Sequence, residues 1–305
     1  MADLSKTTAY MRDKFVPFPE ANVSIASAPV LYGLSIYTVA PVFWNEETKD
    51  FHIFRIKDHF KRLQNSARIM AFDGFDKEWD FERFESTMIE LLEKNKIRKD
   101  SLLRVSLFVD AELMGARMHD LTHSLCAFVY PSAPLIPKSG AHLCVSNWRR
   151  TPDNAIPSRA KINGSYVNAA LMRHEAMLSG FDDAIALDEQ GHVAESTVAN
   201  LFIVRGGNLI TPSSSTDLLE GITRDTVMKL ADFFDIETEE RTVDRSELYI
   251  ADEIFICGSS MQITPVTKVD HRLIGDGKPG KITSKIVDAY DKYGRLPEEQ
   301  LPWHS

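Results

Sequence analysis

The sequence predicts a mixed α and β protein of two domains. Runs with the 3.6-residue spacing of amphipathic helices alternate with β-rich runs, and 305 residues that are 44% hydrophobic suffice for two full cores. Between two such regions lies "PSAPLIPKSG", with three prolines and one glycine, which can continue neither a helix nor a central strand. We therefore predict a small amino-terminal α/β domain at 1–130, an interdomain loop at 131–140 and a larger domain at 141–305.

The first domain opens with a β-rich region that leads into two helices. In the first helix, Phe60, Leu63, Ile69 and Met70 keep roughly helical spacing. Two further apolar runs have the length and composition of strands. We expect strand-like segments over 30–44, 51–56, 101–110 and 124–130, and helices over 57–72 and 79–96.

The second domain changes pattern, from a strand, a turn and a long helix to short strands in quick succession. An Asn-Gly turn at 163–164 opens an amphipathic helix that reaches Met177. The following runs are short and apolar, which favours a domain rich in short antiparallel strands. We expect strands over 181–188, 192–197, 199–206, 208–213, 237–243 and 252–258, and helices over 223–236 and 281–294.

Charge and cysteine content exclude several classes of protein. With 35 Lys and Arg against 44 Asp and Glu, the net charge is −9, and no basic run offers a nucleic-acid surface. The amino terminus lacks the apolar core of a signal peptide, and no window approaches the ~20 apolar residues of a membrane span, so we predict a cytoplasmic protein. Cys126, Cys144 and Cys257 are far apart without a CxxC spacing, which predicts reduced, mostly buried thiols and no zinc site.

Lys161 is the first candidate for chemistry. Most lysines are solvated surface charges, whereas an amine that forms a Schiff base needs burial or a neighbouring charge to lower its pKa. Asn163, Gly164 and Tyr166 follow it closely and could hold it in place. The residues alone leave both interpretations open.

Glu195 is the second candidate. It lies in a predicted strand with apolar neighbours, and an unpaired buried carboxylate is costly. A cationic ring nitrogen of a cofactor would explain it, and so would a structural partner such as an arginine.

Two further segments could bind an anion. Residues 221–223 (Gly-Ile-Thr) precede a helix that begins near Arg224, where free amides and the Thr223 hydroxyl could meet a phosphate, although this is also an ordinary helix cap. Residues 258–260 (Gly-Ser-Ser) follow an apolar strand and form either a plain turn or a second cradle of amides and hydroxyls.

Four stretches together resemble the class IV aminotransferases, the fold-type IV enzymes that depend on pyridoxal 5'-phosphate. They are "AKINGSYVNAALMRHEA", "VAESTVANLFIV", "EGITRD" and "DEIFICGSSMQITPV", which occur in the family's order and spacing within a match from about Val30 to Gly280. The resemblance implies a pseudo-barrel of short strands in the larger domain, bound pyridoxal 5'-phosphate, a homodimer, and an amino donor and a 2-oxo acid as small-molecule substrates.

The resemblance also implies roles for the residues of the site. Lys161 matches the Schiff-base lysine, which moves the proton as acid and base, and Glu195 matches the carboxylate that keeps the pyridine nitrogen protonated. Tyr166 matches the phenol at the ring oxygen. Arg62 matches the phosphate-binding arginine, although without the resemblance it could not be preferred to Lys61. The remaining phosphate positions are matched by Ile222, Thr223 and Ser259.

The substrate positions depart from the branched-chain pattern. In the early strand, branched-chain aminotransferases usually carry aromatic-Glu-Gly-x-Arg, whereas this chain has Tyr37, Val39 and Pro41 at the aromatic, glycine and arginine places. A Tyr-x-Val strand is typical of (R)-amine transaminases and also resembles D-amino-acid aminotransferases. Other positions match the branched-chain type, namely Tyr32, Arg104 and Met114. The predicted substrate-binding residues also include Ser260.

We predict a transaminase of branched-chain type that works by two half-reactions, with a side activity toward (R)-amines. The alternatives are an (R)-amine or D-amino-acid transaminase, a lyase of the aminodeoxychorismate type, and a binding protein on a retired enzyme fold. Arg117 and His119 resemble the carboxylate trap of D-amino-acid aminotransferases, but the spacing from Arg104 is about three residues too long, and a solvated loop is the plainer interpretation.

Overall fold

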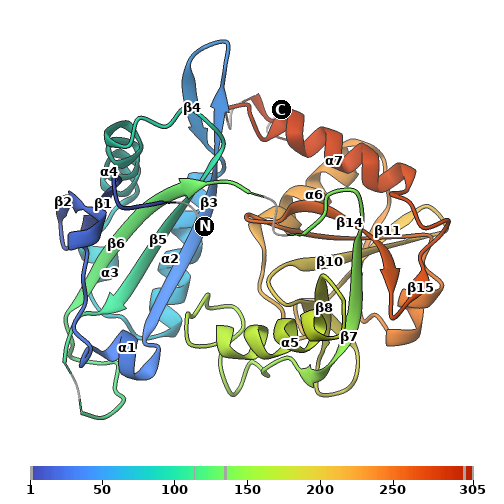
Figure 1. Cartoon of the computed structure of the whole chain (residues 1–305), viewed down its shortest axis with the longest axis horizontal. Coiled ribbons are helices and arrows are strands. Elements are labelled where there is room, and N and C mark those ends of the chain that lie inside the picture. Colours follow the sequence, from blue (N-terminus) through green and yellow to red (C-terminus); the bar gives the residue numbers. More distant parts are fainter. Residues whose placement is uncertain (1–2, 113, 134–135, 298–299, 304–305) are drawn as a thin grey trace. The chain divides into compact units, whose positions relative to one another are not determined.

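The computed structural model describes residues 3–112, 114–133, 136–297 and 300–303, which form two compact units (Figure 1). The first unit contains the described residues up to Ser132 together with Ala160–Ser165. The second contains Ala133–Arg159 and the described residues from Tyr166 onward. Of the predicted interdomain loop at 131–140, Pro134 and Leu135 lie outside the described residues.

The first unit is built on a six-stranded antiparallel sheet in the order β2-β1-β6-β5-β3-β4. Helix α2 packs against β3, helix α4 packs against β1 and β6, and the two helices contact each other. The strands are β1 (Thr8–Met11), β2 (Lys14–Pro17), β3 (Ser35–Asn45), β4 (Asp50–Ile53), β5 (Ser101–Val109) and β6 (His123–Pro131), and the helices are η1 (Phe18–Glu20), α1 (Ala28–Tyr32), α2 (Ile56–Ile69), α3 (Phe75–Glu78) and α4 (Phe81–Lys94).

Local sequence explains where these elements begin and end. The predicted strand over 30–44 was wrong at its start, because Pro29 in the first turn and Gly33 in the left-handed conformation at the end bound the short helix α1. Strand β3 therefore begins at Ser35. The Asp80 side chain caps α4 by accepting a hydrogen bond from the Arg83 amide. Strands β1 and β2 were not predicted, since the polar amino-terminal segment shows no clear alternation.

The second unit is built on a nine-stranded mixed sheet in the order β12-β11-β10-β13-β14-β7-β8-β9, with β15 paired to β14. Strand β7 pairs in parallel with both β8 and β14, and β11 pairs in parallel with β12. The strands are β7 (Ala141–Arg149), β8 (Asp183–Leu187), β9 (Val193–Ser196), β10 (Asn200–Arg205), β11 (Asn208–Pro212), β12 (Thr238–Arg241), β13 (Glu253–Gly258), β14 (Gln262–Val269) and β15 (Arg272–Leu273), and the helices are α5 (Tyr166–Leu178), α6 (Ile222–Phe233), η2 (Arg245–Tyr249) and α7 (Lys281–Tyr293).

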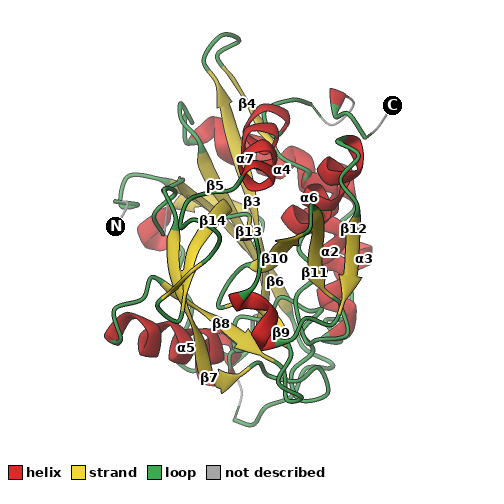
Figure 2. Ribbon diagram, turned by 90° about the vertical axis from the view of Figure 1, so that its right-hand side faces the viewer, coloured by secondary structure: helices red, strands yellow, loops and turns green. Residues whose placement is uncertain are grey.

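Most strand pairs of this unit are antiparallel, as expected, and the parallel pairs were not predicted. Helix α5 connects β7 to β8 and helix α6 connects β11 to β12, and parallel neighbours need such a crossover. Figure 2 shows α5 beside β7 and β8, which it contacts. Strand β9, at one end of the strand order, also contacts β10 and β11, so the sheet curls as the predicted pseudo-barrel requires.

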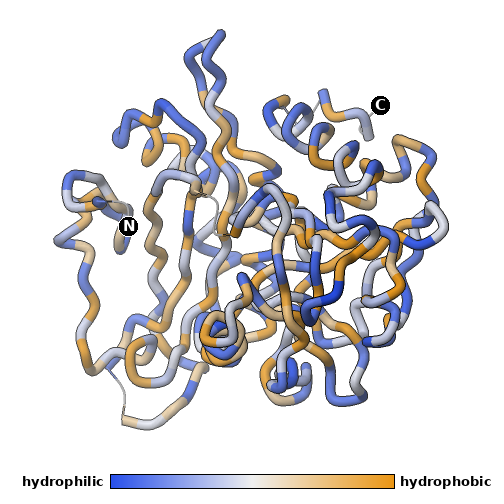
Figure 3. Tube along the Cα trace, turned by 45° about the vertical axis from the view of Figure 1, so that its right-hand side comes forward, coloured by the Kyte–Doolittle hydropathy of each residue, from blue (hydrophilic) through white to orange (hydrophobic). Residues whose placement is uncertain are grey.

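The centre of the second sheet is apolar on both faces. Leu201, Phe202 and Ile203 of β10 are fully buried, and the Phe202 and Phe255 rings stack with their centroids 5.1 Å apart. Such strands give unbroken apolar runs in sequence, which is why β10 and β13 could be predicted. Figure 3 shows the hydrophobic stretches running along the strands, with hydrophilic stretches in many of the loops.

Membrane spans and cysteine chemistry can be assessed from the described residues. None of the helices in the described ranges combines the length and the apolar composition needed to cross a membrane. The three cysteines are free, with Cys144 and Cys257 buried and Cys126 partly exposed. Burial raises the pKa of Cys126 and of Cys144 to about 11, so both stay protonated at neutral pH.

Glu247 joins three elements of the second unit. In η2, its carboxylate accepts hydrogen bonds from both terminal nitrogens of Arg241 on β12 at 2.8 Å, and from Arg205 Nη1 on β10 at 2.6 Å. It also accepts from the Asp244 amide at 3.1 Å in a capping box. The Arg241 hydrogen bonds, with smaller contributions from Asp244 and Arg205, hold the pKa of Glu247 at about 2.

Replacing this carboxylate should make stability less dependent on pH. The pKa of Glu247 is lower in the folded than in the unfolded protein. The stabilisation of the fold by ionised Glu247 is therefore complete above about pH 4.5 and is lost progressively as the pH falls toward 2. We expect Glu247→Gln to lower the free energy of unfolding at pH 7 by about 1–2 kcal/mol, and the difference from wild type to shrink below about pH 4.5. Urea denaturation at pH 7 and pH 4 measures both.

The matched control is Glu239→Gln, which removes a more exposed carboxylate that pairs with Arg241 at 3.2 Å. It should change the free energy of unfolding by less than about 0.5 kcal/mol. Equal effects of the two substitutions would contradict the assignment of Glu247 as the centre of the network.

Candidate active site

The backbone of Lys161 is fixed to the edge of strand β3. The Tyr37 amide donates to the Lys161 carbonyl at 2.9 Å, the Asn163 amide donates to the Ser35 carbonyl at 2.9 Å, and Ile36 and Ile162 form an antiparallel bridge between them. These bonds place residues 160–165 in the first unit, whereas the sequence predicted them in the second domain. Sequence position could not show this, because the segment pairs with a strand more than a hundred residues earlier.

The side chain of Lys161 belongs to a cluster around one aromatic ring. The half-buried Lys161 Nζ lies 5.0 Å from the centroid of the Tyr37 ring, and Arg104 Cζ lies 3.8 Å from the same centroid. Arg104 Nη2 also donates to Asn163 Oδ1 at 2.6 Å. The amine of Lys161 and a guanidinium therefore lie near the same phenol, which is not the environment of a solvated surface lysine.

The predicted substrate positions on β3 share one face of the strand. Tyr37, Val39 and Pro41 alternate along β3 and are all buried, and Val39 is paired directly opposite Arg104 on β5. All three positions thus lie on the face of β3 that Tyr37 presents to Lys161 and Arg104. The face combines an aromatic ring and aliphatic side chains with one cation.

The other predicted substrate positions of the first unit lie in more exposed segments. Tyr32, at the end of α1, accepts a hydrogen bond from the Gly115 amide at 2.8 Å and so contacts the loop that contains Met114. Met114 is 93% exposed, and Arg117 and His119 are also exposed. Their exposure agrees with the solvated-loop interpretation.

Helix α2 presents a second cluster to the opposite side of β3. His59, Arg62 and Ser66 are spaced at i, i+3 and i+7, which places them on one helix face. Arg62 Nη2 donates to Thr38 Oγ1 at 3.1 Å, His59 Nδ1 lies 2.7 Å from the same oxygen, and Ser66 Oγ accepts from the Lys161 amide at 3.2 Å. Arg62 is thus half-buried and oriented, whereas the adjacent Lys61 is exposed.

This cluster is strongly cationic. Burial, followed by the positive charges of Arg62, Arg55 and Lys161, lowers the pKa of His59 well below its usual value. His59 is therefore neutral at physiological pH while three cations surround it. The positive charge of this cluster is suited to binding a phosphate group.

Glu195, on β9, is buried in the second unit and has an arginine partner. Its Oε1 lies 2.8 Å from Arg150 Nη2, and its Oε2 accepts from Asn200 Nδ2 at 3.1 Å and from the Leu219 amide at 3.4 Å. The structural partner that the sequence left open is therefore present. Because a carboxylate offers about four acceptor positions, an arginine partner and a bond to a ring nitrogen do not exclude each other.

Asn200 connects the predicted anion-binding segments of the second unit. Its Nδ2 bonds both Glu195 and the Leu219 carbonyl, the latter at 2.9 Å, and a Cβ on Gly221 would come within 2.0 Å of its Oδ1. On the neighbouring strand β13 it is paired with Cys257, the residue before the 258–260 turn. Glu195, the start of α6 and the Gly-Ser-Ser turn therefore lie at one end of β10.

The start of α6 has the form of an anion site. Ile222 and Thr223 are its first residues, and the N-cap is Gly221, which brings no side chain over the amides of the first turn. The side chain of Arg224 points away from this anion site, since its buried guanidinium donates to the Pro212 carbonyl at 3.0 Å and pairs with Glu240 at 2.6 Å. The N-cap is therefore Gly221 and not Thr223, so the ordinary threonine cap that the sequence left open is not the one observed.

The remaining predicted residues occupy places that are compatible with their predicted roles. Ser259 and Ser260 are half-buried in the turn between β13 and β14, and Tyr166 is the half-buried first residue of α5. The set of donors, with an arginine, helix amides and hydroxyls for a phosphate and a carboxylate for a ring nitrogen, fits a phosphorylated pyridine cofactor.

Several residues of these clusters were not predicted. Thr38, His59 and Ser66 hold Arg62 and Lys161 in the first unit, while Arg150 and Asn200 hold Glu195 in the second. The spacing of three and four residues on α2 was a usable signal for His59 and Ser66. Arg150 had none, because it meets Glu195 only in the folded sheet.

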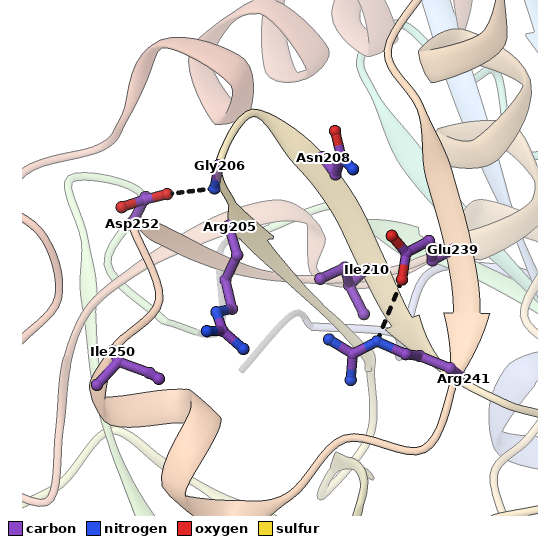
Figure 4. Close-up of a pocket in the computed structure, with 8 residues that line it drawn as sticks. All are labelled: Arg205, Gly206, Asn208, Ile210, Glu239, Arg241, Ile250 and Asp252. Carbon is purple, nitrogen blue, oxygen red and sulfur yellow. Dashed lines mark hydrogen bonds and ion pairs between the residues drawn. The ribbon is translucent and has the colours of Figure 1, made fainter.

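Two cavities lie away from these clusters. One, of about 520 Å³, is shown in Figure 4 and is lined by residues of β10, β11 and β12 with Ile250 and Asp252. The other, of about 460 Å³, lies in the first unit between the amino-terminal segment and residues 95–101. Among the described residues that line them, no predicted site residue occurs, and the arginines of the first cavity are paired with Glu247 or Glu239.

The family model described as "Amino-transferase class IV" matches residues 42–269. A probable branched-chain-amino-acid aminotransferase of Aquifex aeolicus is 38% identical over 293 residues, which cover 95% of this chain and 93% of the relative. Among solved structures, a branched-chain aminotransferase of Thermoproteus uzoniensis with norvaline superposes with a TM-score of 0.91 at 31% identity, covering 97% of this chain and 98% of that chain.

A second solved structure is of a branched-chain amino acid aminotransferase from Thermobaculum terrenum in its PLP form. It superposes with a TM-score of 0.89 at 30% identity and covers 96% of this chain and 95% of that chain. Similarity therefore extends over nearly the whole length of both units.

Asn200 offers a test of the second-unit cluster. Asn200→Asp places a second carboxylate beside buried Glu195 and removes the amide donor, so it should destabilise the protein by about 3 kcal/mol or more. Asn200→Ala only removes the donor and should cost about 1–3 kcal/mol. Urea denaturation measures both, with Asn208→Ala on β11 as control; wild-type stability of Asn200→Asp would contradict the arrangement.

Proposed function

This chain belongs to the class IV aminotransferase family and depends on pyridoxal 5'-phosphate, and we propose that it transfers the amino group of branched-chain and other hydrophobic L-amino acids to a 2-oxo acid. One observation carries the choice of substrate. Arg104 and Lys161 lie against the same Tyr37 ring, so a cation able to bind a substrate carboxylate stands beside the reactive amine. The names of the relatives agree with this substrate class.

The residues that match the family's cofactor positions would hold the cofactor. Arg62 and the amides and hydroxyls of Ile222, Thr223 and Ser259 would bind the phosphate, and Tyr166 would bind the ring oxygen. When bound, the cofactor supplies an electron-accepting ring that stabilises the negative charge left when the substrate loses its α-proton.

Lys161 would move that proton as acid and base. Its backbone is fixed by Tyr37 and Ser66, so the origin of the side chain is set and only the side chain itself needs to move. The Arg104 guanidinium lies against the same Tyr37 ring as the Lys161 amine.

Glu195 would hold the proton on the pyridine nitrogen. Its pairing with Arg150 balances the charge of the buried carboxylate, and Asn200 fixes the position of Oε2. These contacts would keep the carboxylate ionised and oriented before the cofactor arrives.

The face of β3 would select the substrate. Tyr37, Val39 and Pro41 provide an apolar surface for a hydrophobic side chain, and Arg104 provides charge for the carboxylate. This cation favours amino acids over simple amines as main substrates. The Tyr-x-Val pattern supports a weaker side activity toward (R)-amines, with 2-oxoglutarate or pyruvate as acceptor.

A homodimer is part of the proposal. The large apolar side chains of Val167, Leu171 and Leu178 on α5 are 66%, 40% and 77% exposed, and a second copy of the chain would cover such side chains. The cytoplasmic location stays a prediction of the sequence.

Half-reactions with single amino donors test the substrate class. Mixing the holoenzyme with L-leucine should change the visible absorbance of the cofactor faster than D-alanine or (R)-1-phenylethylamine does, because only L-leucine combines a hydrophobic side chain with a carboxylate in the expected orientation. Stopped-flow absorbance measures the three rates. No change with L-leucine and a fast change with either of the others would overturn the proposed substrate, and pyruvate release without a 2-oxo acid would indicate a lyase.

Removal of the reactive amine tests the mechanism. Lys161→Ala should lower the rate of transamination by about 10²-fold to 10⁴-fold or more, since the proton carrier is gone. Lys61→Ala, which removes an exposed lysine of α2, is the matched control and should retain the wild-type rate. Wild-type transamination by Lys161→Ala would refute the assignment.

A further inference from the structure

His59 is a buried titratable residue to which the proposed reaction gives no role. Its side chain is 1% exposed, and Nε2 has no hydrogen-bond partner among the residues that the structure describes. A buried ring nitrogen without a partner costs about 1–3 kcal/mol, which an apolar side chain of similar size would avoid. The role of the histidine must therefore lie in its other nitrogen.

That nitrogen is connected to Arg62 through the hydroxyl of Thr38. His59 Nδ1 lies 2.7 Å from Thr38 Oγ1, and Arg62 Nη2 donates to the same oxygen at 3.1 Å. A guanidinium can only donate, and a hydroxyl has a single hydrogen. The hydrogen-bond chain is satisfied when Thr38 accepts from Arg62 and donates to an unprotonated Nδ1, which leaves the proton on Nε2.

The surroundings select this neutral form of the histidine. Burial lowers the pKa of the ring, and the positive charges of Arg62, Arg55 and Lys161 lower it further. An imidazolium would donate to Thr38 instead of accepting from it and would repel the arginine. Thr38 is itself 1% exposed, and its branched side chain has few rotamers, so the oxygen has one position.

We propose that Thr38 and His59 are positioning residues for Arg62: the neutral imidazole orients the Thr38 hydroxyl, and this hydroxyl holds the guanidinium ready to bind the cofactor phosphate. The inference rests on the proposed role of Arg62. It assigns Thr38 to cofactor binding, although its neighbours Tyr37 and Val39 on β3 belong to the substrate face.

Cofactor affinity with and without the phosphate group tests the proposal. Apoenzyme is titrated with pyridoxal 5'-phosphate and with pyridoxal, and binding is followed by absorbance. Thr38→Val, which keeps the shape but removes the hydroxyl, should weaken pyridoxal 5'-phosphate about tenfold and leave pyridoxal unchanged. Thr38→Ser, which restores the hydroxyl, should bind both nearly as wild type does. Unchanged pyridoxal affinity also shows that Thr38→Val is folded.

A double-mutant cycle with Arg62→Met separates positioning from general support. If Thr38 acts through Arg62, adding Thr38→Val to Arg62→Met should weaken pyridoxal 5'-phosphate less than twofold further. His59→Leu should repeat the phosphate-selective loss, and His59→Asn, with an acceptor near the place of Nδ1, should lessen it.

The outcomes distinguish this inference from the proposed function. Equal losses for both ligands, full additivity with Arg62→Met, or unchanged affinity in Thr38→Val would each overturn the positioning role while the cofactor assignment stands. If the wild-type chain binds no pyridoxal 5'-phosphate, or if Arg62→Met loses no phosphate-dependent affinity, the underlying assignment of Arg62 fails and this inference fails with it.

Discussion

The docking of residues 161–163 onto the edge of β3 is the interaction on which the rest of the first-unit cluster depends. Hydrogen bonds from Tyr37 to Lys161 and from Asn163 to Ser35 fix the lysine to a strand inside a six-stranded sheet. The fit leaves no space for side chains beside it, because a Cβ on Gly33 would approach Gly164 Cα to 2.8 Å. Gly33 also has a φ of +68°, which glycine adopts readily.

The side chains of β3 alternate between its two faces and so contact two different groups of residues. Tyr37 faces Lys161 and Arg104, while Thr38 meets Arg62 and His59 on α2. Because side chains alternate with a period of two, the proposed substrate face and the proposed cofactor face are separated by a single residue. Under the proposed function, substrate specificity could therefore change at 37, 39 and 41 while Arg62 keeps its support from Thr38 and His59.

The sequence predicted most of what depends on local pattern and on family motifs. The mixed α and β fold, the aminotransferase family and the cofactor were predicted correctly. The short helix α1, strands β1 and β2 and the parallel pairs were missed, since a proline, a left-handed glycine and two crossover helices decide them. The site residues stay predictions, and their supports, such as Arg150 for Glu195, come from strands distant in sequence and leave no periodic signal.

The pairing of Arg150 with Glu195 shows why a structural and a functional interpretation of a buried carboxylate need not compete. An isolated charge in this sheet would be too costly to hold, whereas a paired one can be kept ionised on β9. The backbone carbonyl of Asp217 accepts from Arg150 Nε at 3.2 Å, so the arginine itself is oriented. In the proposed function, the ion pair would thus allow Glu195 to present a carboxylate to a ring nitrogen, as Thr38 and His59 would allow Arg62 to meet a phosphate.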